Sequence, residues 1–263
     1  MTGASPSADP ILAIDGLDKH FGGLRAVAGA SFSVRRGSLT ALIGPNGAGK
    51  TTLFDLVTGF ASPDRGTIRF DGRSIAGLPP HRITALGLVR TFQLTRVFAA
   101  MTVLDNMMLA APDQPGESLW HLVAPRRASR RSETAVRERA LALLRHFSLE
   151  DKSEDYAGTL SGGQRKLLEL ARALMTSPRM VLLDEPMAGV NRVLGRRLLD
   201  YVAELRHTGD VTFLFVEHDM DVVMTRADHV VVMAEGAVIA ADRPELVRAN
   251  PRVIDAYLGG AVP

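Results

Sequence analysis

The chain has 263 residues, a length that corresponds to roughly one or two domains. With 46% hydrophobic and 23% charged residues, its composition is that of a globular protein with a sizeable core and excludes wholesale disorder. The net charge is only +2, which gives no support to a nucleic-acid binder held by a strong positive field. The absence of cysteine excludes a disulfide scaffold, a cysteine-ligated zinc site and an iron–sulfur cluster.

Neither a membrane-spanning nor a secretory segment is expected. No apolar run approaches the length of about 18 residues that indicates a transmembrane helix. Residues 1–10 are small and polar, and they lack the basic start and apolar middle of a signal peptide, so we expect a flexible leader. We therefore expect a soluble chain that reaches a membrane only through partners.

Short apolar, β-branched runs alternate with helical patterns, which predicts an α/β protein. A mainly helical region is expected at residues 97–158. The strands are expected, in chain order, at residues 11–17, 31–34, 39–43, 67–70, 180–183, 211–216 and 230–233. The last three runs are apolar throughout, as buried parallel strands are. The prediction is a sheet-based core interrupted by a helical insertion.

A glycine-rich segment after the strand at 39–43 carries the strongest functional signal. Its residues match the phosphate-loop pattern G-x-x-x-x-G-K-[ST] and are Gly44, Pro45, Asn46, Gly47, Ala48, Gly49, Lys50 and Thr51. Backbone N–H groups in such a loop, and the helix that Thr52 continues, favour bound phosphates. Lys50 would reach the β- and γ-phosphates, and Thr51 would ligate Mg²⁺. A plain glycine-rich turn is the alternative interpretation.

Two carboxylates, Asp184 and Glu185, follow the strand at 180–183. Asp184 can hold Mg²⁺ through water, and Glu185 can polarise a water molecule aimed at the γ-phosphate. Acidic pairs at strand ends are common. The phosphate loop upstream is what makes this interpretation specific.

Residues 160–164, Leu-Ser-Gly-Gly-Gln, open a helical pattern that continues to about residue 175. Ser161 and Gln164 have the spacing of a capping box, so an ordinary helix start is one interpretation. The adjacent Gly162 and Gly163 expose backbone N–H groups at the positive end of the helix, which suits a phosphate. The residues alone leave both interpretations open.

Together these three motifs resemble the nucleotide-binding subunits of ATP-binding-cassette (ABC) transporters, over nearly the whole chain. Residues 160–164 match the family's signature motif as written. The resemblance implies a P-loop NTPase core with a mainly parallel sheet, an antiparallel β subdomain and an inserted α-helical subdomain. It also implies that two ATP molecules lie between two cassettes. The signature of one cassette, Ser161, Gly162, Gly163 and Gln164 here, would complete the ATP site of the other.

The resemblance implies five segments. They are a leader at residues 1–10, a core with the β subdomain and phosphate loop at 11–96, a helical subdomain that ends at the signature at 97–160, the second half of the core at 161–241, and a helical tail at 242–263.

Further positions match family motifs one at a time. Gln93 resembles the glutamine that touches Mg²⁺ or water and senses the membrane partner, and His218 resembles the switch histidine that contacts the γ-phosphate. Phe21 resembles the aromatic residue that stacks on adenine. The alternatives are a plain loop glutamine, a helix-start residue and a core aromatic. Asn191 stands where most cassettes carry aspartate, which puts one contact across the cassette dimer in doubt.

Other stretches narrow the resemblance to the larger ATPase of branched-chain amino acid importers. They are residues 21–27 and 90–93, the long spacer between Gln93 and Ser161, and the tail at 250–259. The resemblance implies ATP and Mg²⁺ as cofactors. It implies a second ATPase subunit, two polytopic permease subunits and an extracytoplasmic binding protein as partners, no nucleic acid, and a peripheral location on the cytoplasmic face of the inner membrane. Urea or short-amide import and lipopolysaccharide export remain alternatives.

Two other classes of protein fit the sequence less well. A chromosome-maintenance ATPase needs a long coiled coil between the phosphate loop and the signature, but only 110 residues, 51–160, separate Lys50 from Ser161. A non-hydrolysing regulatory module would be expected to lack Lys50, Glu185 or His218, and all three are present.

Two groups of residues keep open interpretations. Val97, Phe98 and Met101 either line a groove for a membrane partner or belong to the core. The arginines that follow residue 125 form either a solvated helix face or a contact with lipid head groups or a partner.

Overall fold

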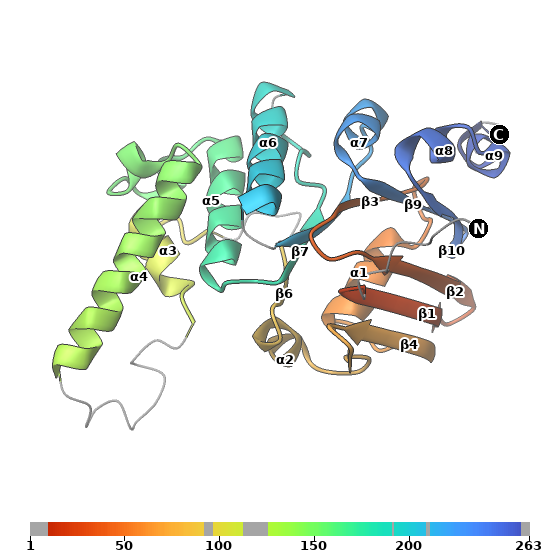
Figure 1. Cartoon of the computed structure of the whole chain (residues 1–263), viewed down its shortest axis with the longest axis horizontal. Coiled ribbons are helices and arrows are strands. Elements are labelled where there is room, and N and C mark those ends of the chain that lie inside the picture. Colours follow the sequence, from red (N-terminus) through yellow and green to blue (C-terminus); the bar gives the residue numbers. More distant parts are fainter. Residues whose placement is uncertain (1–9, 92–96, 113–125, 191, 209–210, 259–263) are drawn as a thin grey trace, which may run out of the picture. The chain divides into compact units, whose positions relative to one another are not determined.

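The structure is a computed structural model that describes residues 10–91, 97–112, 126–190, 192–208 and 211–258 (Figure 1). The chain forms two compact units. The first comprises Met1–Arg90, Arg179–Pro186 and Val202–Pro263, and the second comprises Thr91–Pro178 and Met187–Tyr201. None of the helices in the described ranges is long and apolar enough to cross a membrane.

A six-stranded sheet forms the centre of the first unit, in the order β10-β9-β3-β8-β7-β6. Its strands are β3 (Leu39–Ile43), β6 (Leu88–Arg90), β7 (Met180–Asp184), β8 (Thr212–Val216), β9 (His229–Ala234) and β10 (Ala237–Asp242). All neighbours are parallel except β10, which runs antiparallel to β9. Every residue of β3, β7 and β8 is buried, as the continuous apolar runs require.

An antiparallel sheet in the order β2-β1-β4-β5 forms the second layer of this unit. Its strands are β1 (Leu12–Phe21), β2 (Leu24–Val34), β4 (Arg65–Phe70) and β5 (Arg73–Ser74). Phe21 pairs with Leu24 across a two-residue turn whose Gly22 has φ +57°. A glycine in this left-handed region suits the tight turn of a hairpin.

Helix α1 (Lys50–Thr58) is sandwiched between the two sheets. Its Leu53, Phe54, Leu56 and Val57 are buried in one core with side chains from both sheets. Burial of large side chains of this kind contributes about 1.5–3 kcal/mol each. The core therefore fixes the helix that follows the phosphate loop.

The first unit also contains α2 (Pro80–Ala85), α7 (Met220–Arg226), α8 (Pro244–Arg248) and α9 (Pro251–Leu258). Of these, α2 contributes Ile83 to the shared core. Asp219 caps α7 by accepting hydrogen bonds from the N–H groups of Asp221 and Val222.

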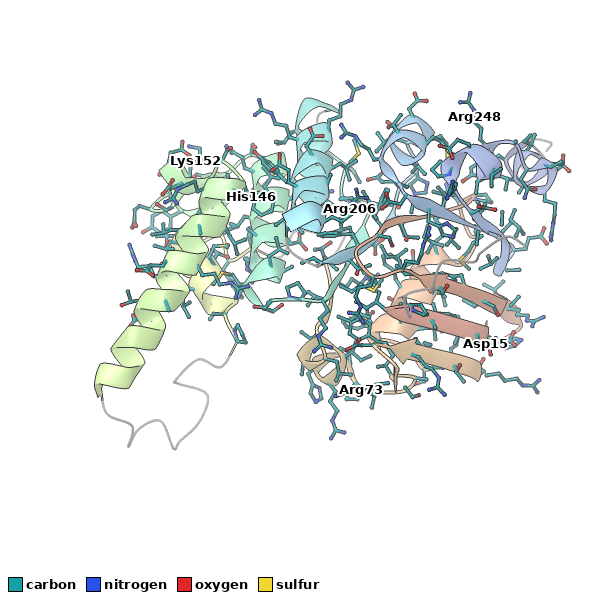
Figure 2. All side chains as sticks on the ribbon, in the orientation of Figure 1. Asp15, Arg73, His146, Lys152, Arg206 and Arg248 are labelled. Carbon is teal, nitrogen blue, oxygen red and sulfur yellow. The ribbon has the colours of Figure 1, made fainter. Side chains whose placement is uncertain are left out.

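The second unit is helical. It contains α3 (Val103–Leu109), α4 (Arg126–His146), α5 (Gly162–Met175), the first part of α6 (Arg192–Thr208), and two 3₁₀ turns at Glu150–Lys152 and Ala157–Thr159. Helices α3, α4 and α5 contact one another around buried residues such as Met107, Leu144 and Leu168. Three aromatic rings pack together in this unit, with 5.1–5.3 Å between each pair of ring centroids. They belong to His146, Phe147 and Tyr201, and His146 is labelled in Figure 2.

The predicted fold class is confirmed: a mainly parallel sheet, an antiparallel sheet and an inserted helical part are all present. The finer division at residues 96, 160 and 241 stays a prediction. Strands β5, β6 and β10 were not predicted from the sequence.

Candidate nucleotide site

The phosphate loop is packed so closely against its neighbours that two positions admit only glycine. A Cβ on Gly44 (φ +152°) would lie 2.0 Å from the carbonyl oxygen of Met233 in β9. A Cβ on Gly49 (φ +94°) would lie 2.2 Å from the carbonyl oxygen of Ala26 in β2. Strands from both sheets therefore hold the loop in a shape that L side chains cannot adopt without strain.

Lys50, the first residue of α1, folds back over this loop. Its side chain is buried, and Nζ donates hydrogen bonds to the carbonyl oxygens of Gly44 (2.8 Å) and Pro45 (2.9 Å). Burial lowers the pKa of Lys50, while the charge of Glu185 acts in the opposite direction. A partly desolvated cation held in this way is placed to bind an anion more strongly than it would in water.

The loop forms one wall of a cleft of about 520 Å³, a volume typical of small-ligand sites. The predicted residues that line it are Asn46, Gly47, Ala48, Gly49, Lys50, Thr51, Thr52, Glu185 and His218. The cleft thus brings the phosphate loop together with the candidate base and the candidate switch histidine.

Glu185 and His218 form a hydrogen-bonded pair, with 2.9 Å between Oε1 and Nε2. Glu185 directly follows β7 and has φ +48°, a left-handed conformation that costs a non-glycine residue about 1–3 kcal/mol. Its N–H donates to the carbonyl oxygen of Val216 at the end of β8 (3.2 Å). The neighbouring strand thereby holds a strained turn that directs the carboxylate to His218.

Asp184 ends β7, and its side chain is only 9% exposed. In the described part of the chain, no group of three or more His, Asp or Glu side chains could form a metal cage. Mg²⁺ that accompanies phosphates needs no such cage, since one or two protein oxygens suffice beside the phosphates and water. The Asp184 carboxylate and the Thr51 hydroxyl are oxygen donors of this kind, so the donor set fits Mg²⁺.

The signature residues begin α5 through a complete capping box. Ser161 Oγ accepts from the N–H of Gln164 (3.3 Å), and Gln164 Oε1 accepts from the N–H of Ser161 (2.9 Å). A Cβ on Gly163 would lie 2.0 Å from Leu194 Cδ2. The capping interpretation is confirmed, and the phosphate interpretation stays a prediction.

Other predicted residues lie apart from the cleft lining or outside the described residues. Phe21 is 52% exposed at the end of β1, with Lys19 Nζ 5.4 Å from its ring centroid, and it is not among the lining residues. Its adenine role stays a prediction. Gln93 and Asn191 lie outside the described residues. Phe98 is 48% exposed, which excludes the core interpretation for that side chain.

Four lining residues were missed: Leu24, Arg25 and Ala26 of β2, and Glu235 after β9. Gly236, the next residue, donates its N–H to the carbonyl oxygen of Ala48 (3.2 Å). The Glu-Gly pair that follows the strand at 230–233 is the one signal that could have placed a turn there.

The two sheets, the phosphate loop and the Glu185–His218 pair define a P-loop nucleotide-binding cassette. A family model described as "ABC transporter" matches residues 27–188. A second model, "Branched-chain amino acid ATP-binding cassette transporter", matches residues 237–263. The chain belongs to the ABC transporter family. The predicted family and the predicted enzyme class, an ATPase, are thereby confirmed.

Similar proteins match over nearly their full length. The chain is 45% identical to the high-affinity branched-chain amino acid transport ATP-binding protein BraF of Pseudomonas aeruginosa, over 96% of this chain and 99% of that protein. It is 43% identical to a probable branched-chain amino acid transport ATP-binding protein, LivG, of Archaeoglobus fulgidus, over 95% of each. A crystal structure of an ABC transporter cassette in its ADP conformation superposes with a TM-score of 0.81 at 37% identity, covering 96% of this chain and 100% of that one.

Proposed function

We propose that this chain hydrolyses ATP to drive an importer of branched-chain or related hydrophobic amino acids. The observation that carries the ATPase assignment is the cleft in which the phosphate loop and the Glu185–His218 pair lie together. The cargo class is supported by the full-length relatives BraF and LivG, whose names specify branched-chain amino acid transport.

In the proposed mechanism the nucleotide phosphates replace contacts that the loop now makes with itself. The ammonium of Lys50 exchanges the carbonyl oxygens of Gly44 and Pro45 for phosphate oxygens, which carry more negative charge. The backbone N–H groups at the start of α1 face the same phosphates. Binding therefore needs little rearrangement of the main chain.

Glu185 is the proposed group that polarises the attacking water. His218 is proposed to orient the Glu185 carboxylate and to contact the γ-phosphate. The hydrogen bond between them fixes the direction of the carboxylate before the water arrives. Asp184, Thr51 and Gln93 are the proposed Mg²⁺ ligands. When held by these residues, Mg²⁺ would supply positive charge against the charge that develops on the phosphate oxygens.

The proposed assembly contains a second cassette, whose ATP site is completed by residues Ser161, Gly162, Gly163 and Gln164 of this chain. It also contains two polytopic permease subunits, supplied with cargo by an extracytoplasmic binding protein. In this assembly the chain lies on the cytoplasmic face of the inner membrane, and Phe21 stacks on adenine.

The assembly is tested by capturing the tagged chain from detergent-solubilised native membranes and identifying its partners by mass spectrometry. Two polytopic permeases and a second, shorter cassette are expected, and the added binding protein then allows its ligand to be screened. A homodimer with β-rich export components would replace the proposal with lipid export. A binding protein specific for urea or short amides would replace the cargo class alone.

The catalytic assignment is tested with Glu185→Gln, which removes the charge and keeps the shape. We expect the hydrolysis rate to fall about 10²- to 10⁴-fold, because general-base assistance is lost, while ATP affinity is retained. Glu245→Gln on the exposed surface of α8 is the matched control and should hydrolyse at the normal rate. Hydrolysis at full rate by Glu185→Gln would refute the role of Glu185.

A further inference from the structure

Arg90, the last residue of β6, connects three elements of the first unit. Its side chain is only 7% exposed. Nη1 donates to Asp55 Oδ1 in α1 (2.5 Å), and Nη2 donates to Asp184 Oδ2 at the end of β7 (2.7 Å). The guanidinium thus ties the candidate metal ligand to the helix that begins at Lys50.

The surroundings of Arg90 leave its side chain little freedom. Strand pairing sets Arg90 opposite Leu182, two residues before Asp184. The guanidinium carbon lies 5.5 Å from the ring centroid of Phe54, a cation–π distance. A planar guanidinium presents two separate nitrogen atoms in fixed directions, which a lysine ammonium cannot reproduce.

The charges of this group favour a bound cation. Two carboxylates and one guanidinium give a net charge of −1 for Asp55, Arg90 and Asp184. Asp55, whose side chain is 38% exposed, offsets the positive charge that Arg90 brings to Asp184. Asp184 can therefore be held by an arginine without losing its attraction for a metal ion.

We propose that Arg90 is a positioning residue that orients the Asp184 carboxylate for Mg²⁺, with Asp55 as its counter-charge. The inference rests on the proposed function, in which Asp184 serves the metal. Partners behind a ligating carboxylate fix its orientation, and their loss typically weakens metal binding about 10- to 100-fold. Arg90 acts through Asp184 and needs no contact with the nucleotide.

The test measures the binding of trinitrophenyl-ATP by fluorescence, once in EDTA and once across a Mg²⁺ titration. For Arg90→Lys and Arg90→Met we expect the Mg²⁺ concentration for half-maximal enhancement of binding to rise about 10-fold. We expect the affinity in EDTA to stay within about twofold, because the phosphate loop is untouched. A residue that merely supported the fold would weaken binding in both conditions.

A second variant keeps the test decisive if Arg90 proves necessary for folding. Asp55→Asn leaves the Arg90–Asp184 hydrogen bond in place and changes the net charge of the group from −1 to zero. We expect it to raise the Mg²⁺ requirement in the same direction without changing the affinity in EDTA.

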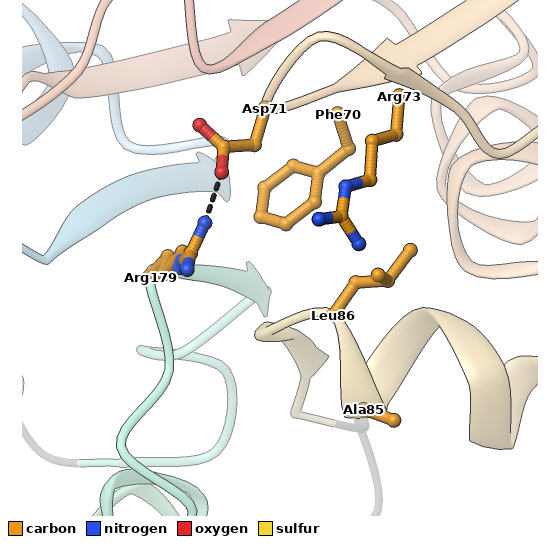
Figure 3. Close-up of a pocket in the computed structure, with 6 residues that line it drawn as sticks. All are labelled: Phe70, Asp71, Arg73, Ala85, Leu86 and Arg179. Carbon is orange, nitrogen blue, oxygen red and sulfur yellow. Dashed lines mark hydrogen bonds and ion pairs between the residues drawn. The ribbon is translucent and has the colours of Figure 1, made fainter.

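Arg179→Met is the matched control. Arg179 stands next to the first residue of β7 and forms an ion pair with Asp71 beside a small pocket of about 110 Å³ (Figure 3). Arg179 and Asp71 form an arginine–aspartate pair like Arg90 and Asp184, but at the start of β7 rather than at its end. We expect its Mg²⁺ requirement to equal that of the unaltered chain.

Two results would overturn the inference. One is an unchanged Mg²⁺ requirement in folded Arg90→Lys and Asp55→Asn. The other is tighter Mg²⁺ binding in Arg90→Met, because the guanidinium would then act only as a competing charge. If the unaltered chain binds no nucleotide, it is the proposed function that fails, so the two failures are distinguishable.

Discussion

Two helices of this molecule begin at glycine-rich segments, yet their first turns are built differently. Helix α1 follows Gly49 in a left-handed conformation and has no side-chain cap among the described residues. Helix α5 follows Ser161, which forms a reciprocal capping box with Gln164. The first helix start leaves its N–H donors to a ligand, whereas the second already pairs two of them internally.

Under the proposed function, this difference separates a phosphate site with an uncapped helix start from one whose helix start is already capped. At α1, the buried Lys50 and the loop carbonyls supply the preorganisation. At α5, a phosphate that binds the signature as proposed would compete with the Ser161 hydroxyl for the N–H of Gln164 or bind beside that hydrogen bond. Glycine beside a helix start therefore occurs in two structural contexts, one without a side-chain cap at α1 and one with a capping box at α5.

Alanine substitutions test the comparison most severely. In Gly49→Ala, a left-handed φ and a Cβ 2.2 Å from Ala26 O should together cost about 2–5 kcal/mol and abolish nucleotide binding. In Gly162→Ala, the new Cβ meets no described atom within 4 Å apart from its chain neighbours and the backbone of its own helix, and a gain of about 0.4–1 kcal/mol is expected. Urea unfolding midpoints and nucleotide titrations measure both. Equal midpoints for the two variants would refute the distinction.

Removal of the Lys50 charge probes the open helix start directly. Lys50→Ala should weaken ATP binding by about 1.5–3 kcal/mol, or roughly 10- to 150-fold in Kd, because charge-assisted hydrogen bonds to the phosphates are lost. Isothermal titration with ATP provides the measurement. Lys152→Ala, in the second unit, should bind normally. An unaltered Kd in Lys50→Ala would contradict our view of the loop.

Two substitutions of Ser161 separate capping from phosphate recognition. Ser161→Ala should destabilise the chain by about 1 kcal/mol, since the cap is lost. Ser161→Asp retains a capping oxygen and should keep the unfolding midpoint, but its charge repels phosphate. In the assembled transporter we expect Ser161→Asp to lose ATP hydrolysis. Normal hydrolysis there would leave Ser161 as a cap alone.

The sequence predicted those features that are written in consecutive residues. The phosphate loop, the strand before it and the capping box of Ser161 each depend on local spacing, and local spacing is visible in the sequence. Strand β6 is three residues long and becomes a strand only by pairing with β7. The bridge from Arg90 to Asp184 spans 94 residues. Such contacts depend on tertiary pairing, for which the sequence offers no periodic signal.

The smallest expected effect concerns His229 of β9, the strand that pairs with the strand preceding the phosphate loop. His229 begins β9 opposite Thr40 of β3, and its Nδ1 is buried with no hydrogen-bond partner in the described part of the chain. Burial lowers the pKa of His229 below 6.5; Arg35 adds to this effect, and Asp242 opposes it.

Between about pH 6.5 and the lowered pKa, His229 therefore binds a proton in the unfolded chain but not in the folded chain. The stability that His229 contributes is fully present above about pH 6.5 and is lost as the pH falls through the lowered pKa. His229→Gln should lose less stability than the unaltered chain between pH 7.5 and 5.5, measured by urea unfolding. His81→Gln on the exposed surface of α2 should retain the full acid sensitivity. If His229→Gln were as acid-sensitive as the unaltered chain, the proton uptake would have to be assigned to another group.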